Sequence, residues 1–206
     1  KPLLQHWLES LAASRQFEEV IINTHYLAEE VDEFFSSYAP PIGINISYER
    51  KLLGPGGTLL RHRDQLASGD FLVAHADNFS LISWQEFLDA YHSRPDHCVG
   101  LMMTFESDDP SSCGIVQTDA QGVVTAMHEK VQSPPGRLAN AATFLFSPKV
   151  FEIIDRLDPA TVFDISQDII PSLYGYLATY ENTRYHRDIG TLKALSQARE
   201  DHGRML

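Results

Sequence analysis

Two aspartates stand beyond the ends of short strands that the sequence predicts. Asp77 follows Phe71–His75, a mostly apolar run typical of a buried strand, and Asp188 lies far downstream, just before Gly190. An open α/β sheet binds its ligands beyond the carboxyl ends of its strands, and carboxylates there are suited to a divalent cation and its phosphate ligand. The pair therefore indicates metal-assisted chemistry on a phosphate-bearing substrate.

Each aspartate also has a simpler structural interpretation. Asp77 is equally compatible with a turn residue that caps the next segment, and Asp188 with the N-cap of the last helix. The two residues are far apart in the chain, so the sequence does not show that their side chains meet.

A glycine-rich segment precedes a predicted helix over residues 58–66. Its glycines would let the backbone approach a flat ligand closely, and a helix N-terminus favours anions. It is not a Walker A motif, because Gly-Lys-Ser/Thr is missing. An ordinary connection between elements is the alternative. The candidate nucleotide-binding residues here are Gly54, Pro55, Gly56 and Gly57.

Three further polar residues lie at predicted strand ends. Lys130 is able to hold a phosphate as a point charge, and Glu129 to accept hydrogen bonds from sugar hydroxyls. Asn140 is able both to donate and to accept such bonds. The alternatives are a solvated surface pair for Glu129 and Lys130, and a turn residue for Asn140.

Composition limits the class of protein. The chain has 206 residues, of which 43% are hydrophobic, which fits a single domain over residues 1–206 with a real core. The net charge of −12 and the absence of a Lys/Arg cluster argue against nucleic acid and anionic lipid as partners. No 18-residue apolar run and no signal peptide are visible, and Cys98 and Cys113 form no CxxC motif. We therefore expect a cytoplasmic protein with reduced cysteines and no membrane span.

The order of the predicted elements indicates an α/β fold. Helical and strand patterns alternate through the first half, which predicts a Rossmann-like mixed, mainly parallel sheet flanked by helices. The middle of the chain is richer in strands, and Asp119–Gly122 reads as a hairpin turn, so some antiparallel pairing is expected. The chain opens directly on a helix over residues 3–11, without the strand and Gly-rich phosphate loop that normally begin such a sheet.

The order of the motifs resembles the sugar-1-phosphate nucleotidyltransferase family, which makes nucleotide-diphosphate sugars. The likeness covers nearly the whole chain and is closest to mannose- or heptose-1-phosphate guanylyltransferase-like members. It is carried by these segments in order: Asn23–Ala28, Leu53–Gly57, Ala76–Asn78, Glu129–Lys130, Leu138–Ala141, Asp168–Pro171 and Arg187–Thr191.

The resemblance implies a role for each candidate. Asp77 and Asp188 would together hold Mg²⁺ against the α-phosphate of a nucleoside triphosphate, and Lys130 would bind the phosphate of a sugar 1-phosphate. Glu129 and Asn140 would bind sugar hydroxyls, and the Gly54–Gly57 segment would lie along the base. The products would be an NDP-sugar, for polysaccharide or glycoconjugate synthesis, and pyrophosphate. A homodimer would be compatible with the family.

Departures from the family pattern bear on activity. The family's first strand, its triphosphate loop with an arginine and a following catalytic lysine have no counterpart, and Lys1 does not replace that lysine. We therefore expect an N-terminally incomplete domain that is inactive or nearly so in this form. Ala76 and Ala142 stand where the family usually has Gly, and Val131 where it usually has Pro. The Ala142 methyl group would alter the sugar site. A non-catalytic, nucleotide-sugar-binding regulatory relative is the alternative.

Overall fold

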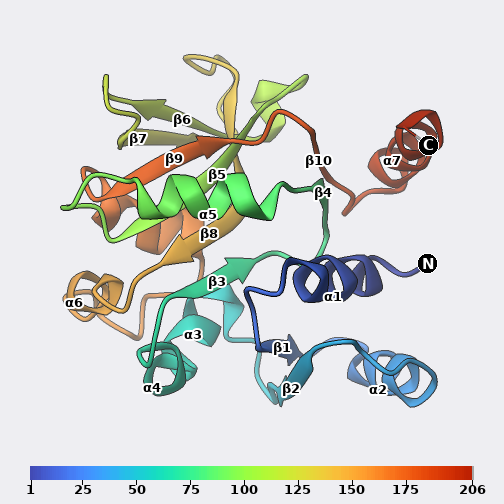
Figure 1. Ribbon diagram of the computed structural model, residues 1–206. Coiled ribbons are helices and arrows are strands. Elements are labelled where there is room, and N and C mark those ends of the chain that lie inside the picture. The colour runs from blue at the N-terminus through green and yellow to red at the C-terminus, as the bar shows by residue number, and fades with distance from the viewer. Residues whose placement is uncertain (206) are drawn as a thin grey trace. The chain divides into compact units, whose positions relative to one another are not determined.

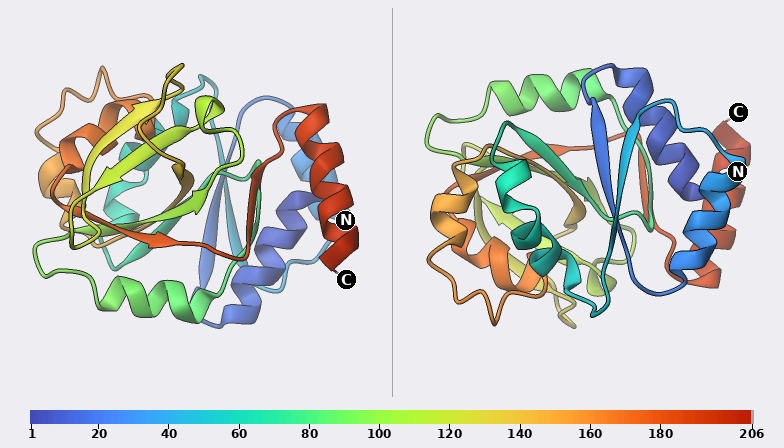
Figure 2. Two further views of the ribbon diagram at one scale, coloured as in Figure 1. Left: turned by 90° about the horizontal axis from the view of Figure 1, so that it is seen from above. Right: turned by 90° about the horizontal axis from the view of Figure 1, so that it is seen from below.

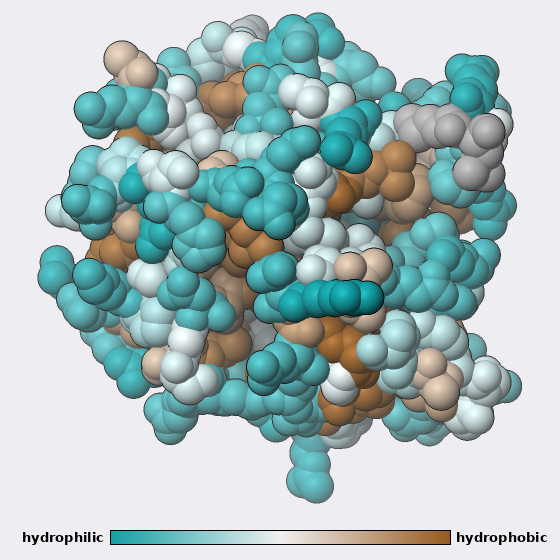
Figure 3. Space-filling view, in the orientation of Figure 1, coloured by the Kyte–Doolittle hydropathy of each residue, from teal (hydrophilic) through white to brown (hydrophobic). Residues whose placement is uncertain are grey.

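The computed structural model describes residues 1–205, which form two compact units, residues 1–54 and residues 55–205 (Figure 1). The prediction of a single domain stays a prediction. Within the described residues, no helix is long and apolar enough to cross a membrane. Hydrophilic residues predominate on the face shown in Figure 3, as the acidic composition suggests, and apolar residues show between them.

The first unit contains a helix–strand–helix–strand sequence. Its elements are α1 (Leu3–Ser14), β1 (Glu19–Thr24), α2 (Ala28–Ser37) and β2 (Gly43–Tyr48). β1 and β2 pair in parallel, with Val20 opposite Ile44, as the alternating pattern predicts. Leu27 lies before α2 in the left-handed region and is 56% exposed, so it does not belong to the apolar face of this helix.

The second unit carries the larger sheet and all the remaining elements. Its α-helices, in chain order, are α3 (Gly54–Arg61), α4 (Arg63–Leu66), α5 (Trp84–His92), α6 (Val150–Ile154) and α7 (Leu192–Met205). Its strands are β3 (Phe71–Ala74), β4 (Asn78–Leu81), β5 (Gly100–Glu106), β6 (Gly114–Thr118), β7 (Val124–Glu129), β8 (Leu138–Phe146), β9 (Leu177–Glu181) and β10 (Tyr185–Asp188).

β8 organises this sheet. It pairs with β5 along both of its halves, with β6 near its start and with β3 near its end. The register between β5 and β8 shifts between Met102 and Thr104, which marks a bulge in β8 at residues 141–143. The outer neighbour of β8 thus changes from β6 to β3 at the bulge.

The mixed α/β class is confirmed, but the expected predominance of parallel pairing is wrong for the described strands. Only β1–β2 and β5–β9 pair in parallel, whereas β3–β8, β5–β8, β6–β8, β6–β7 and β4–β10 are antiparallel. The reason is that β8 runs opposite to three neighbours, and that the predicted Asp119–Gly122 turn joins β6 and β7 as a hairpin. Of these antiparallel pairings, only the β6–β7 hairpin was predictable from the local sequence.

Both faces of the sheet are covered. Phe87 and Tyr91 of α5 are buried, and Phe87 lies 5.4 Å from the Tyr180 ring of β9. The main core cluster includes Met102 and Phe144 together with residues of the 150–173 segment, among them Ile165. Because β5 is buried on both faces, it reads as a continuous apolar run rather than an alternating one.

Candidate functional site

The antiparallel ribbon of β4 and β10 brings the two aspartates together. Asp188, the last residue of β10, is paired with Asn78, the first residue of β4, so it lies beside Asp77. The Ile189 N–H donates a hydrogen bond of 3.0 Å to the Asp77 carbonyl, which continues the ladder beyond the strands. This pairing joins residues that the sequence alone could not connect.

Both carboxylates face the space beside Gly190. A β-carbon placed on Gly190 would lie 3.0 Å from Asp188 Oδ1 and 3.9 Å from Asp77 Oδ2. The Gly190 N–H donates to Asp188 Oδ1 at 2.7 Å, which orients that carboxylate. Two oxygens of two carboxylates thus lie within 4 Å of one point, in a place that the glycine leaves open.

The simpler interpretation does not fit Asp188, and for Asp77 it accounts for the backbone but not for the side chain. Thr191, not Asp188, caps α7, because its hydroxyl accepts the Ala194 N–H at 3.1 Å. Asp77 lies in the turn between β3 and β4, but its exposed carboxylate has no hydrogen-bond or ion-pair partner within residues 1–205. Both side chains are therefore available to a ligand from solvent.

His186 lies on the same face of β10 as Asp188. Its Nδ1 shares a 2.7 Å hydrogen bond with the Ser80 hydroxyl, and its ring lies 4.3 Å from the Phe105 ring. Burial lowers the pKa of His186 to about 4, and the attraction of Asp188 offsets this only in part. The imidazole is therefore neutral at pH 7 and does not cancel the negative charge of the aspartates.

Glu129 lies over Gly114, its register partner on β6. A β-carbon on Gly114 would come within 2.5 Å of Glu129 Oε2, so only glycine leaves room for this carboxylate. Burial raises the pKa of the Glu129 carboxyl, and the Lys130 ammonium lowers it in part. With 31% of its side chain exposed, Glu129 is not a solvated surface residue.

Lys130 extends from the end of the same hairpin. Its Nζ lies 3.8 Å from Glu129 Oε1, its side chain is 68% exposed, and its N–H donates to the Cys113 carbonyl at 3.1 Å. Its φ of +48° lies in the left-handed region. Within the described part of the chain, no hydrogen bond or ion pair links Lys130 to either aspartate, so the structure does not join the two groups directly.

The resemblance implies that Glu129 binds sugar hydroxyls, and on that expectation Gly114→Ala should weaken sugar-phosphate binding without unfolding the protein. The added methyl group would push the Glu129 side chain away from its place, since a flexible carboxylate yields more easily than backbone. The KM for the sugar 1-phosphate should rise about tenfold while the KM for the nucleoside triphosphate stays unchanged. Gly136→Ala is the matched control, because nothing lies within 4 Å of its β-carbon. Equal KM values in the Gly114 variant and this control would contradict the role assigned to Glu129.

Asn140 lies at the β8 bulge and is not a turn residue. Its Oδ1 accepts the Ala142 N–H at 2.8 Å, and its Nδ2 donates to the Ser166 hydroxyl at 3.2 Å. Nδ2 also donates to Met127 Sδ at 3.9 Å. These bonds fix the orientation of the amide and leave one lone pair of Oδ1 for a ligand. Bulges of this kind often aim side chains at active sites.

Ala142, within the bulge, has a φ of +47°, a region that L-residues avoid and glycine occupies freely. We therefore expect Ala142→Gly to raise the free energy of unfolding by about 1 kcal/mol. Ala141→Gly is the control, and it should lower the free energy of unfolding, because this buried neighbour lies at negative φ, where glycine has no advantage. Urea unfolding of the three proteins measures both changes, and a less stable Ala142→Gly protein would contradict the argument from backbone strain.

The glycine-rich segment forms the start of a helix. α3 begins at Gly54, which has a φ of +72°, and a second short helix, α4, follows. The prediction of a loop over residues 54–57 and one helix over residues 58–66 is therefore wrong. The Gly56 N–H donates to the Phe163 carbonyl at 2.8 Å, and a β-carbon there would lie 2.9 Å from Val162 Cγ1. Gly56 thus has a packing role, and contact with a base stays a prediction.

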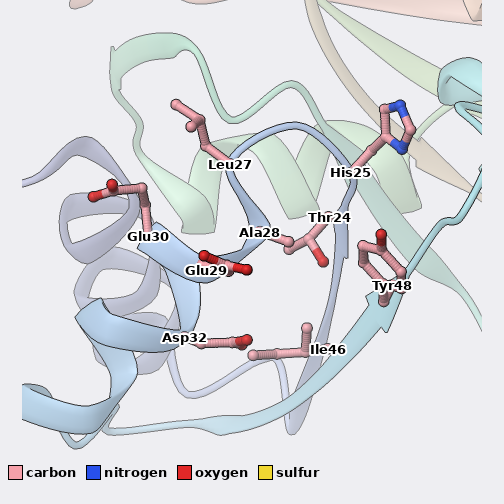
Figure 4. Close-up of a pocket in the computed structure, with 9 residues that line it drawn as sticks. All are labelled: Thr24, His25, Leu27, Ala28, Glu29, Glu30, Asp32, Ile46 and Tyr48. Carbon is pink, nitrogen blue, oxygen red and sulfur yellow. The ribbon is translucent and has the colours of Figure 1, made fainter.

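A hollow of about 540 Å³ lies in the first unit, at the carboxyl ends of β1 and β2 and the start of α2 (Figure 4). Its wall includes the carboxylates of Glu29 and Asp32 and the exposed ring of Tyr48. An acidic wall repels phosphate, and none of the predicted site residues lines it. The candidate site is therefore the group of polar residues in the second unit.

Sequence analysis missed several supporting residues of this site. Gly114 and Gly190 create space for carboxylates, and His186 and Ser80 lie beside Asp188. The only sequence signal was the position of these glycines next to strand ends. Among the described residues there is no group of three or more His, Cys, Asp or Glu side chains that could hold a metal, so any cation here would have two protein carboxylates and ligands from elsewhere.

The chain matches the nucleotidyl transferase family over residues 1–204. It belongs to that family. The match and the named relatives confirm the resemblance to sugar-1-phosphate nucleotidyltransferases. The chain is 30% identical to the probable mannose-1-phosphate guanylyltransferase 2 of Arabidopsis thaliana, over 84% of this chain and 48% of the relative. It is 28% identical to the glucose-1-phosphate thymidylyltransferase of Streptomyces griseus, over 78% of this chain and 44% of the relative. The chain thus spans about half the length of the curated relatives that it matches.

The fold also matches solved structures of the family. The crystal structure of HddC from Yersinia pseudotuberculosis complexed with GMP-PN superposes with a TM-score of 0.78, at 20% identity, and covers 97% of this chain and 85% of that one. This confirms the fold of a nucleotidyltransferase. The relatives differ in the base and the sugar that their names state, so the family alone leaves both open for this chain.

Proposed function

We propose that the protein transfers a nucleotidyl group from a nucleoside triphosphate to a sugar 1-phosphate. An oxygen of the sugar phosphate attacks the α-phosphorus, the bond to the β-phosphate oxygen breaks, and an NDP-sugar and pyrophosphate form. The observation that carries the proposal is the meeting of Asp77 and Asp188 beside Gly190 in a member of this family. The NDP-sugar would serve as a precursor of polysaccharides or glycoconjugates.

The chemistry of the two aspartates fits Mg²⁺. Their oxygens are hard ligands, are exposed, and leave the remaining coordination positions to phosphate and water, which is the usual protein environment of this cation. Bound there, Mg²⁺ would neutralise charge that develops on the α-phosphate. Gly190 keeps the space open, and its N–H holds Asp188 in place.

The other side chains position the sugar phosphate. Lys130 would attract its phosphate, and Glu129 and Asn140 would hydrogen-bond its hydroxyls. The residues at the start of α3, Gly54–Gly57, would bind the nucleotide. No protein nucleophile is required, because the reaction proceeds by positioning and charge neutralisation. A cytoplasmic location and a homodimer complete the proposal.

Pyrophosphate release tests the function. The complete gene product and the 206-residue chain are each incubated with Mg²⁺, the nucleoside triphosphates and a panel of sugar 1-phosphates. Release with one base and sugar pair by the complete product supports the proposal and identifies the substrates. Activity of the 206-residue chain alone would contradict the expectation that it is nearly inactive. No release from either, with nucleotide-sugar binding retained, would instead favour a regulatory relative.

A further inference from the structure

The ribbon that carries the two aspartates has a second, charged face. Strand alternation directs Arg187 to the side opposite Asp188, together with Tyr185 and Phe79. α7 lies beside this face of β10, as Figures 1 and 2 show. His202 of α7 meets the Phe79 ring edge-on at 5.6 Å.

Arg187 is at the centre of a partly buried network on that face. Its Nε lies 3.1 Å from the Tyr185 hydroxyl and 3.5 Å from Asp201 Oδ2 of α7. The Tyr185 hydroxyl also donates to Asp201 at 2.8 Å, and Gln197 holds the other oxygen of Asp201 at 2.9 Å. Only 25% of the Arg187 side chain and 16% of the Asp201 side chain are exposed, so solvent screens this pair less than a surface ion pair.

The same guanidinium reaches the loop between β5 and β6. Its Nη2 lies 3.3 Å from Asp108 Oδ2, whose side chain is 76% exposed. This loop is braced by bonds of its own, such as that from Ser111 to Asp109, and the carbonyl of Cys113 at its end accepts the Lys130 N–H. Arg187 therefore connects the ribbon of the aspartates to the segment that positions Lys130.

We propose that Arg187 is a positioning residue for the two carboxylates. It fastens the β4–β10 ribbon to α7 through Asp201, beside the bond from Tyr185 of the same strand to Asp201, and more weakly to the 107–113 loop through Asp108. A two-stranded ribbon is marginally stable by itself, so an attachment on its rear face limits how far Asp77 and Asp188 move apart. The inference rests on the proposed function only in assigning a cation to these carboxylates.

The strengths of the contacts set the expected effects. Loss of a partner that orients metal ligands costs about tenfold or more in metal affinity, so Arg187→Met should weaken Mn²⁺ binding by about tenfold. Arg187→Lys keeps the charge but loses the planar fork, and its affinity should lie between those of Arg187→Met and the unmodified protein. Asp108→Asn should change affinity by less than about twofold, because exposed ion pairs contribute little.

The experiment measures Mn²⁺ binding to the complete gene product by electron paramagnetic resonance, and the Mg²⁺ concentration that gives half-maximal pyrophosphate release. Arg184→Met is the matched control, because Arg184 lies three residues earlier and pairs at 3.5 Å with Glu86, away from the aspartates. In Arg187→Met, both the dissociation constant for Mn²⁺ and the Mg²⁺ concentration for half-maximal release should rise. In Arg187→Lys, both values should lie between those of Arg187→Met and the unmodified protein. The KM for the sugar 1-phosphate should change less than the constant for Mg²⁺.

The outcomes separate this inference from the proposed function. If Arg187→Met lowers the melting temperature but binds Mn²⁺ like the Arg184→Met control, Arg187 is only structural and the inference is wrong. If the protein releases no pyrophosphate, yet Asp77→Asn and Arg187→Met both weaken Mn²⁺ binding, the inference holds and the proposed function fails. If the unmodified protein releases pyrophosphate and Arg187→Met binds Mn²⁺ equally tightly, the inference is wrong and the proposed function stands.

Discussion

Asp77→Asn should abolish Mg²⁺-dependent pyrophosphate release by the complete gene product, with a loss in kcat/KM on the order of 10²- to 10³-fold. The substitution keeps the size of the side chain but removes the charge that would hold the cation beside Gly190. The fold should persist, because the exposed Asp77 side chain makes no contact that stabilises the β4–β10 ribbon within the described residues. Pyrophosphate release across a range of Mg²⁺ concentrations measures the effect.

The pair Asp77 and Asp188 provides a sharper form of this test. Because both residues are expected to hold one cation, the double variant should be little worse than either single variant. Asp64→Asn is the control, since its carboxylate is fully exposed and makes only a 3.9 Å contact with Arg63. Retention of Mg²⁺-dependent turnover in Asp77→Asn, or strictly additive losses in the double variant, would show that the two aspartates do not share a cation.

Gly100→Ala should cost about 3 kcal/mol of unfolding free energy, at the upper end for an overpacked core. Gly100 lies on β5 between Phe146 of β8 and Leu177 of β9. A β-carbon there would lie 2.5 Å from Phe146 Cδ1 and 2.8 Å from the Leu145 carbonyl oxygen. The ring could turn slightly, but the carbonyl belongs to the β5–β8 ladder and cannot move without breaking it.

Urea unfolding of the complete gene product measures this change. Gly69→Ala is the matched control, because its β-carbon would meet nothing within 4 Å and its φ is not positive. Its stability should stay within about 0.5 kcal/mol of that of the unmodified protein. If Gly100→Ala proves as stable as this control, the close packing of β5 against β8 is not as described.

Local sequence determined several of the elements and the end of the strand before Asp77, but it did not predict β4 or β10. The apolar run before Asp77, the β-branched core of β1 and the Asp119–Gly122 turn each depend on residues within a few positions of one another. Periodicity and turn chemistry report such short-range preferences directly. The order of the motifs then indicated the family, which the match over residues 1–204 confirmed.

Tertiary structure alone decided which of these residues meet. Asp188 reaches Asp77 because β10 pairs with β4, and the Glu129 carboxylate finds space because Gly114 lies opposite it across a hairpin. The bulge that orients Asn140 arises where β8 changes its neighbour from β6 to β3. Except for the hairpin, these are pairings between distant segments. Many registers satisfy the same local pattern, and only packing of the whole sheet selects one.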